Sequence, residues 1–324
     1  MRRLDFTLIT MSRLLKVAVV GVGHLGKWHA DKHAAAADCE LVAVVDTNIE
    51  NARDVAHKHG ADAYSDYRDI IPLVDAISLV VPTSLHYKIA REFLEAGIHC
   101  LIEKPITETV AEAETLIEIA RRKELVLQVG HIERFNSVML GIEENIDNPQ
   151  FLESTRLAPF TTRATDVSVI LDLMIHDIDI ILDLIDSPIR RISASGLSVL
   201  SETIDIANAR IEFENHCVAN VTASRISRKR ERKLRIFQKN AYLSADFQEK
   251  ILAINRKGET DNDEGFKDIT HQELRFEDND ALNLEVLDFI KAIKSTSRPT
   301  VNGEDGKRAL ETAIAITGLI KESL

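Results

Sequence analysis

Three side chains of types that can move protons stand out in this sequence: Lys104, Asp172 and His176. Asp172 and His176 are four residues apart in a stretch with helical spacing, so we expect both side chains on one face of a helix. A carboxylate there can orient the imidazole and stabilise its cation, which suits a base that takes a proton from an alcohol while hydride leaves the carbon. The alternatives are a plain surface pair and a metal site, and the latter is disfavoured because no cysteine or third histidine lies nearby.

Lys104 lies in the triplet Glu103-Lys104-Pro105, directly after an apolar run at 99–103. A lysine beside a glutamate can relay a proton, or can act as a cation that lowers the pKa of a neighbouring base or of a substrate alcohol. A surface ion pair is the alternative for adjacent Glu and Lys. The residues alone leave open whether Lys104 or His176 is the immediate base.

A glycine motif, Gly21-Val-Gly-His-Leu-Gly26, follows the apolar run 15–20 and opens a predicted helix. Glycines at this spacing allow a tight turn, close approach of the backbone to a pyrophosphate, and tight packing of helix on strand. Asp46 ends the next apolar run, where a carboxylate would bind a ribose 2′-hydroxyl. Asp46 and the lack of arginine at 47 and 48 favour NAD over NADP. The predicted cofactor-binding residues are Gly21, Gly23, His24, Leu25, Gly26, Asp46, Pro82, Thr83, His86, Glu103 and Lys104.

These residues need a scaffold, and the apolar pattern from 15 to 130 supplies one. Short runs without alternation, typical of strands covered on both faces, alternate with helical patterns. A capping box at Thr109 and Glu112 opens the helix predicted at 109–122. Strand and helix alternating in this way predict an α/β doubly wound parallel sheet. The predicted strands span 15–20, 40–45, 76–81, 99–103 and 125–129.

After Gly130 the pattern changes to a helix at about 166–186 followed by successive strands. Ala219, Val221 and Ala223 alternate with polar residues, which indicates a sheet buried on one face. We therefore predict an α+β second domain with an open, mainly antiparallel sheet, an acidic surface excursion at 257–281, and two final helices. The predicted strands span 190–200, 204–214, 217–225, 232–238, 241–247 and 250–255. The predicted domains are 1–13 (N-terminal extension), 14–130 (dinucleotide-binding domain) and 131–324 (substrate and oligomerisation domain), whose final helix could pack back on the first domain.

Composition excludes several classes of protein. The 324 residues are 45% hydrophobic, enough for about two domains with proper cores, which argues against a disordered or fibrous chain. A net charge of -12 argues against nucleic-acid binding. No apolar run long enough for a transmembrane helix occurs, and Asp5 and Arg13 interrupt the only segment that resembles a signal peptide. We expect a cytoplasmic protein, with translation starting at Met1 or Met11.

Other polar and sulfur-containing residues have simpler interpretations. Cys39, Cys100 and Cys217 lie far apart among apolar neighbours and are predicted to be buried free thiols. His29 and His33 are expected to be exposed rather than to bind a metal, and we predict no metal site. The segment from Arg225 to Arg235 holds seven basic residues; a solvated strand edge is the default, although it could attract a phosphate-bearing substrate.

Together these motifs resemble the Gfo/Idh/MocA family of glucose-fructose oxidoreductase and inositol dehydrogenase. The resemblance runs from about Lys16 to the C-terminal helix. It implies a Rossmann domain, bound NAD(P), and a C-terminal domain whose sheet commonly forms the oligomer interface, here of a homodimer or homotetramer. It also implies that Lys104, Asp172 and His176 are the catalytic set. The matching segments are GVGHLG, VVPTSLH, EKP, GHIERFN, DLMIHDID and RPTVNGEDGKRALETA.

Within that family, the segments GHIERFN, DLMIHDID and TASRIS are most similar to bacterial UDP-N-acetylglucosamine 3-dehydrogenases. The resemblance implies an NAD-dependent oxidoreductase that removes hydride from a secondary hydroxyl of a sugar or nucleotide sugar. The alternatives are a dehydrogenase of free sugars or inositol and, as a different class, an NAD-binding regulatory protein without catalytic activity.

Overall fold

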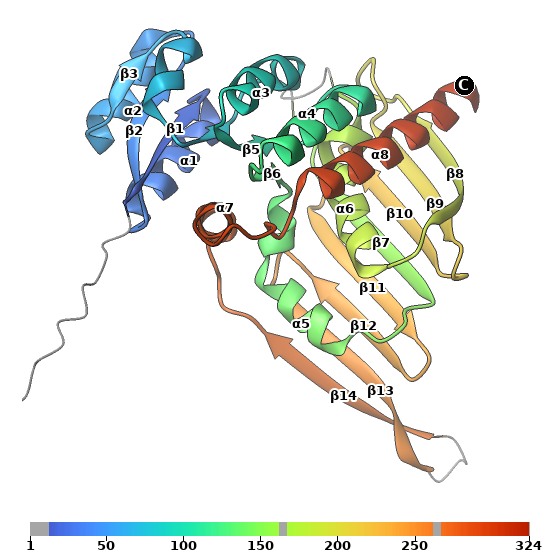
Figure 1. Ribbon diagram of the computed structural model, residues 1–324. Coiled ribbons are helices and arrows are strands. Elements are labelled where there is room, and N and C mark those ends of the chain that lie inside the picture. Colours follow the sequence, from blue (N-terminus) through green and yellow to red (C-terminus); the bar gives the residue numbers. More distant parts are fainter. Residues whose placement is uncertain (1–12, 162–166, 262–266, 324) are drawn as a thin grey trace, which may run out of the picture.

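The computed structural model describes residues 13–161, 167–261 and 267–323. The N-terminal extension predicted at 1–13 thus lies, except for Arg13, outside the described residues. Figure 1 shows a Rossmann half and a second half built on a large sheet.

The first half contains a sheet of six parallel strands in the order β3-β2-β1-β4-β5-β6. The strand order reverses between β1 and β4, so the carboxyl ends of these two strands form the switch point at which such sheets bind ligands. This confirms the predicted doubly wound sheet, although the short edge strand β3 was not predicted. The strands are β1 (Leu15–Val20), β2 (Cys39–Val45), β3 (Asp62–Tyr64), β4 (Ala76–Leu79), β5 (His99–Glu103) and β6 (Leu127–Gly130).

Helices cover both faces of this sheet. One face packs on α1 (His24–Ala35), α2 (Ile49–His59) and α7 (Ala281–Ser295), which share one hydrophobic cluster with the strands. The other face packs on α3 (His86–Glu95) and α4 (Val110–Arg122). The predicted capping box at the start of α4 is present.

The second half contains an eight-stranded sheet in the order β14-β13-β12-β11-β7-β10-β9-β8. Every neighbouring pair is antiparallel except β7 and β10. One face packs on α5 (Ser137–Asn145), α6 (Ile175–Leu184) and α8 (Gly303–Ser323), and no described helix covers the other face (Figure 1). The strands are β7 (Phe151–Leu157), β8 (Ile189–Leu197), β9 (Ile206–Phe213), β10 (Val218–Ser224), β11 (Glu231–Gln238), β12 (Ala241–Asp246), β13 (Ile251–Asp261) and β14 (Lys267–Arg275).

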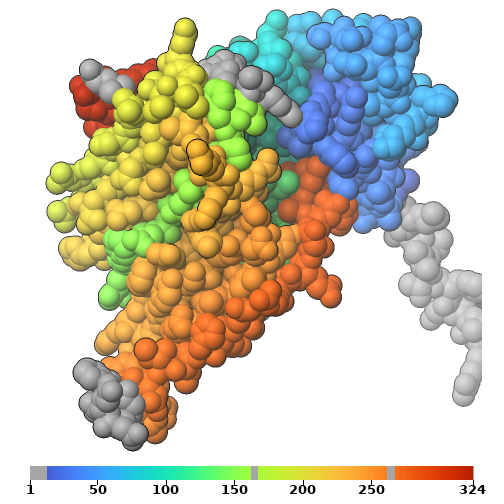
Figure 2. Space-filling view, turned by 180° about the vertical axis from the view of Figure 1, so that it is seen from behind, coloured from blue at the N-terminus to red at the C-terminus, as the bar shows by residue number. Residues whose placement is uncertain are grey.

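Two predictions about this sheet have opposite outcomes. The alternation in β10 is confirmed, because Ala219, Val221 and Ala223 are buried and the polar residues between them are partly exposed. The surface excursion predicted at 257–281 is wrong in part, because β13 extends into it as far as Asp261 and β14 pairs antiparallel with β13. Most of β14 is exposed and held by backbone hydrogen bonds, so its sequence lacks the apolar alternation that would have predicted a strand. The two strands form an arm that projects from the body (Figure 2).

The C-terminal helices join the two halves. Helix α7 contributes Val286 and Phe289 to the core of the Rossmann half. Helix α8 places Leu310 in the other Rossmann cluster and Ala313 in the core of the second half. None of the described helices is long and apolar enough to cross a membrane. The three cysteines are buried and free, as predicted.

Candidate active site

The glycine motif forms the turn between β1 and α1 for the reasons expected from its spacing. Gly21 has φ +89°, and a Cβ there would lie 2.3 Å from the carbonyl oxygen of Val80. A Cβ at Gly26 would lie 1.9 Å from the carbonyl oxygen of Gly21. Gly23 has only open space around the corresponding position. The turn is thus closed on the protein side and open on the side where a pyrophosphate would meet the N-terminus of α1.

Asp46 lies beside this turn at the end of β2. Its Oδ2 accepts a hydrogen bond from the backbone N–H of Val22 at 3.1 Å, and its Oδ1 accepts one from the N–H of Asn48 at 2.9 Å. Two backbone donors therefore fix the carboxylate next to the glycine motif, where a ribose hydroxyl would reach it.

The other predicted cofactor residues fall into two groups. Pro82 and Thr83 lie at the open edge after β4, and Thr83 lines a cavity of about 530 Å³ together with Pro105. His86 and Glu103 point into the protein instead. Both ring nitrogens of His86 lie 2.9 Å from backbone oxygens, those of Pro105 and Val81. His86 therefore ties the two loops together and has no free edge for a cofactor.

Lys104 reaches from the end of β5 to the second half of the molecule. Its Nζ donates to the backbone oxygen of Asp172 at 2.7 Å and lies 3.5 Å from the carboxylate Oδ1 of the same residue. The peptide bond to Pro105 is cis. Lys104 of the first half and Asp172 of the second half, two of the three predicted catalytic residues, are thus in direct contact.

His176 does not make the predicted contact with Asp172. Residues Ile170–Met174 form a π-helical turn that leads into α6, and the wider turn changes the alignment of residues four apart. The carboxylate of Asp172 faces Lys104 instead, and His176 Nδ1 has no hydrogen-bond partner among the described residues. The structure therefore shows no hydrogen bond by which Asp172 would orient His176 among the described residues, contrary to the expectation from helical spacing.

The surroundings of His176 favour the neutral imidazole. Burial lowers the pKa of His176 well below 6.5, and the positive charges of Lys104 and Arg156 lower it further. The ring of His131 stands edge-on to it, with centroids 6.2 Å apart. A neutral, half-buried imidazole beside a lysine can accept a proton from a substrate hydroxyl.

Sequence reasoning missed the buried ion network that anchors α6. Arg156 on β7 binds Asp177, the neighbour of His176, at 2.5 Å and Glu133 at 2.8 Å. Ser154 donates to the same Asp177 at 2.7 Å. The only available signal was the resemblance of the segments around Glu133 and Asp177 to family motifs, because their spacing in the chain does not indicate contact.

His29 and His33 are buried, so the expectation that they are exposed is wrong. His29 Nε2 donates to Glu103 Oε1 at 3.0 Å, and His33 Nε2 lies 2.7 Å from Ser78 Oγ. The reason is that both side chains lie on the face of α1 that packs against the sheet, where His29 meets the end of β5 and His33 meets β4.

The basic run separates into residues with different surroundings. Arg225 is buried against Asp205 at 2.8 Å, and Arg232 binds Glu133 at 3.1 Å. Arg228, Lys229 and Arg230 are exposed in the turn before β11. The run is therefore not one continuous solvated edge.

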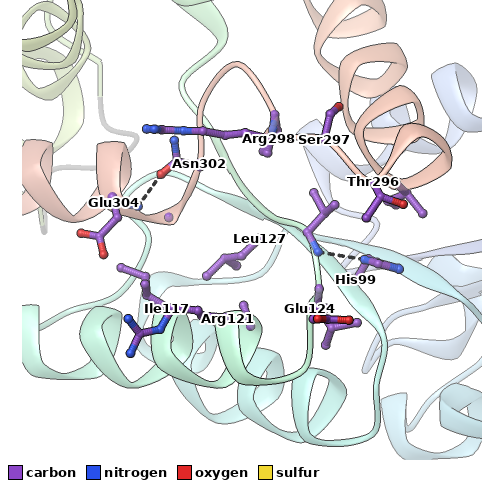
Figure 3. A pocket seen from close by; sticks show the side chains of 16 residues that line it. His99, Ile117, Arg121, Glu124, Leu127, Thr296, Ser297, Arg298, Asn302 and Glu304 are labelled. Atoms are coloured by element: carbon purple, nitrogen blue, oxygen red, sulfur yellow. Dashed lines mark hydrogen bonds between the residues drawn. The ribbon is translucent and has the colours of Figure 1, made fainter.

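A cavity of about 760 Å³ lies away from these residues, at the amino ends of β5 and β6 (Figure 3). Its lining includes His99 and Leu127, while Lys104 follows the opposite end of β5. The nitrogen Nδ1 of His99 is already the acceptor for the backbone N–H of Val126, at 2.9 Å (Figure 3). The cavity shares no side chain with the predicted catalytic set.

Comparison with family models gives two matches. The model described as "Oxidoreductase family, NAD-binding Rossmann fold" matches residues 15–131, and that described as "GFO/IDH/MocA C-terminal domain" matches residues 139–244. The two matches divide the chain at the change from the parallel to the antiparallel sheet.

Comparison with individual proteins points to dehydrogenases of sugars and cyclitols. The UDP-N-acetylglucosamine 3-dehydrogenase of Acidithiobacillus ferrooxidans is 37% identical over 303 residues, covering 93% of this chain and 96% of the relative. The solved structure of that organism's UDP-N-acetylglucosamine 3-dehydrogenase GnnA has a TM-score of 0.89 at 36% identity, with 96% of this chain and 99% of that chain covered. The myo-inositol 2-dehydrogenase of Thermotoga maritima is 25% identical over 327 residues, covering 95% of this chain and 97% of the relative.

Proposed function

The chain belongs to the Gfo/Idh/MocA oxidoreductase family, and from this we propose that it oxidises the C3 hydroxyl of UDP-N-acetylglucosamine or a closely related nucleotide sugar. Membership makes it an NAD(P)-dependent sugar oxidoreductase. The observation that carries the proposal is the contact between Lys104 and Asp172 across the two halves, with a neutral His176 nearby.

The residues present fit a dinucleotide. The open space at Gly23 and the free N–H groups at the start of α1 suit a pyrophosphate, and Asp46 suits the adenosine ribose. When bound, the nicotinamide supplies the acceptor for the hydride that leaves the substrate carbon. We also propose that NAD is preferred over NADP, because a 2′-phosphate would meet the fixed carboxylate of Asp46.

The proton steps are assigned to residues of both halves. His176 takes the proton of the substrate hydroxyl, since burial keeps its imidazole neutral. Lys104 places its positive charge beside the same hydroxyl and stabilises the developing alkoxide. Asp172 holds Lys104 through its backbone oxygen and carboxylate, a role different from orienting His176.

The test of substrate is direct. Purified protein is incubated with NAD or NADP and a panel of UDP-sugars, free sugars and inositol, and product mass is read. We expect a loss of two hydrogens from UDP-N-acetylglucosamine and no change in the free sugars. Turnover of inositol alone would contradict the proposal.

A second candidate is an inositol dehydrogenase, favoured by the similarity to the myo-inositol 2-dehydrogenase of Thermotoga maritima along nearly the whole chain. The inositol dehydrogenase is the runner-up, because the chain is more similar to the nucleotide-sugar enzyme, at 37% identity. In that case UDP-sugars would neither turn over nor compete with inositol.

The open face of the eight-stranded sheet is the proposed homo-oligomer interface. Asn208 and Thr222 hydrogen-bond to each other on it, and Arg235 lies 3.5 Å from Glu153. The mixed charges would complement a second copy of the same face. Sedimentation analysis is expected to give a dimer or tetramer, and a monomer at micromolar concentration would contradict this. We also propose that the protein acts in the cytoplasm.

A further inference from the structure

A second cluster of ionisable side chains lies behind Lys104. It contains His29 from α1, Glu103 from β5 and Glu285 from α7, and their potential ligand atoms all lie within 4.8 Å of one another. His29 and Glu285 are fully buried. The cluster therefore joins β5, which ends at Glu103 just before Lys104, to α1 and α7 on one side of the Rossmann sheet.

Glu103 is held from three directions. Its Oε1 accepts the hydrogen bond from His29 at 3.0 Å, and its Oε2 accepts one from the backbone N–H of Lys104 at 3.2 Å. The carboxyl group also lies flat over Gly130, where an added Cβ would be 3.0 Å from Glu103 Cδ. The position of this carboxylate thus fixes the start of the loop that carries Lys104.

Glu285 differs from Glu103 in having no such partners. Both of its carboxyl oxygens are buried without a hydrogen-bond partner among the described residues. Gln128 on β6 donates to the backbone oxygen of Glu285 at 3.0 Å, and its own buried Oε1 also lacks a donor. The region holds more buried acceptors than donors, and one additional proton would reduce that imbalance.

We propose that Glu285 is a positioning residue, a neutral carboxylic acid whose O–H is directed at the neighbouring Glu103 carboxylate and keeps Glu103, and through it Lys104, in place. Two carboxylates this close in a dry environment cannot both be charged at low cost. The proton belongs on Glu285, because His29 and Lys104 stabilise the anion of Glu103. This inference rests on the proposed function, in which Lys104 acts on the substrate.

The charges around Glu285 agree with this distribution. Burial raises the pKa of Glu285 well above its ordinary value, and the carboxylates of Glu103 and Asp288 raise it further. Burial alone would also raise the pKa of Glu103, but the hydrogen bond from His29 and the charges of His29 and Lys104 lower it. The groups that face Glu285 are thus His29 on α1, Glu103 at the end of β5, neutral Gln128 on β6, and Asp288 on α7.

The test compares two variants of similar size, Glu285→Gln and Glu285→Leu. The glutamine keeps a neutral donor, and we expect its kcat to stay near wild type, whereas the leucine should lower kcat about ten- to a hundredfold by misplacing Lys104. The affinity for NAD should change little in either, which separates loss of position from loss of fold. Wild type should lose kcat at alkaline pH as Glu285 ionises, and Glu285→Gln should lack that loss.

A second measurement does not depend on turnover. At neutral pH, the infrared spectrum of wild type minus that of Glu285→Gln should show the carbonyl band of a protonated carboxylic acid. This subtraction cancels the band of Asp179, whose pKa burial raises to about 7. If no sugar turns over but the band behaves in this way, the proposed function fails and the protonation stands. Equal damage in both variants, absence of the band, or a stoichiometric divalent metal in the purified wild type that Glu285→Gln loses would each overturn the inference.

Discussion

The two halves of the proposed active site are held by different kinds of interaction. In the Rossmann half, backbone geometry positions the groups: Gly21 and Gly26 close the turn, and backbone N–H groups fix Asp46. In the second half, contacts of charged side chains position the groups: Arg156 anchors α6 through Asp177, and Lys104 contacts Asp172. Backbone-held groups follow from local sequence, while ion-pair-held groups depend on residues far away in the chain, so single substitutions should affect the two regions differently.

The largest effect is expected on stability, from Arg156→Met. This change leaves the buried carboxylates of Glu133 and Asp177 without their shared cation, and breaking such a pair costs about 3–5 kcal/mol of unfolding free energy. Denaturant unfolding of wild type and variant measures this loss of unfolding free energy. The matched control is Arg122→Met, which removes an exposed pair with Glu95 and should cost less than about 1 kcal/mol. Equal losses would mean that the second half is not held by its buried ions.

Catalysis should respond most to Lys104→Met and His176→Ala. Each removes a group that we propose acts on the substrate hydroxyl, so kcat should fall at least about a hundredfold. The dissociation constant for NAD should be nearly unchanged, because the cofactor groups are held by the other region. Exposed Lys88→Met and His57→Ala are the controls. Normal turnover in both Lys104→Met and His176→Ala would show that neither residue takes part in the mechanism.

A double-mutant cycle distinguishes the observed arrangement from the one predicted by helical spacing. Asp172→Asn should lower kcat about tenfold by weakening the charged contact with Lys104. Combined with Lys104→Met the losses should be far from additive, and combined with His176→Ala they should nearly add. The reverse pattern would mean that Asp172 orients His176 during turnover.

In the Rossmann half, a substitution at Asp46 tests the role of a carboxylate that is held by backbone N–H groups. Asp46→Asn keeps an acceptor for only one of the two backbone N–H groups and removes the charge, so the KM for NAD should rise about tenfold and the KM for NADP should fall. The exposed Asp54→Asn serves as control. A parallel rise for both cofactors would show that Asp46 supports the turn rather than selecting the ribose.

The sequence predicts groups held by local backbone geometry better than groups held by contacts between distant segments. The glycine turn, Asp46, the parallel sheet and the capping box of α4 depend on neighbours within one strand-turn-helix unit, so spacing was enough. The π-turn before His176 changed an alignment that assumed a regular α-helix. The contacts of His29 and Glu285 with Glu103 join three distant segments, and nothing in the spacing of these residues indicates that they meet. Strand β14 was missed because it is mostly exposed and is held largely by backbone pairing with β13, which leaves little apolar alternation in its sequence.

The smallest expected effect concerns the pH dependence of the base. Because burial and nearby positive charges lower the pKa of His176 below 6.5, the acidic loss of kcat/KM should begin below that pH. Arg232 is one of these charges and is partly exposed, so Arg232→Gln should raise the pKa of His176 and move the acidic loss upward by a few tenths of a pH unit. The shift should shrink at high salt, since solvent ions already screen an exposed charge. A downward shift would contradict the sign of this interaction, and a shift insensitive to salt would mean that Arg232 acts through Glu133 and the buried network instead.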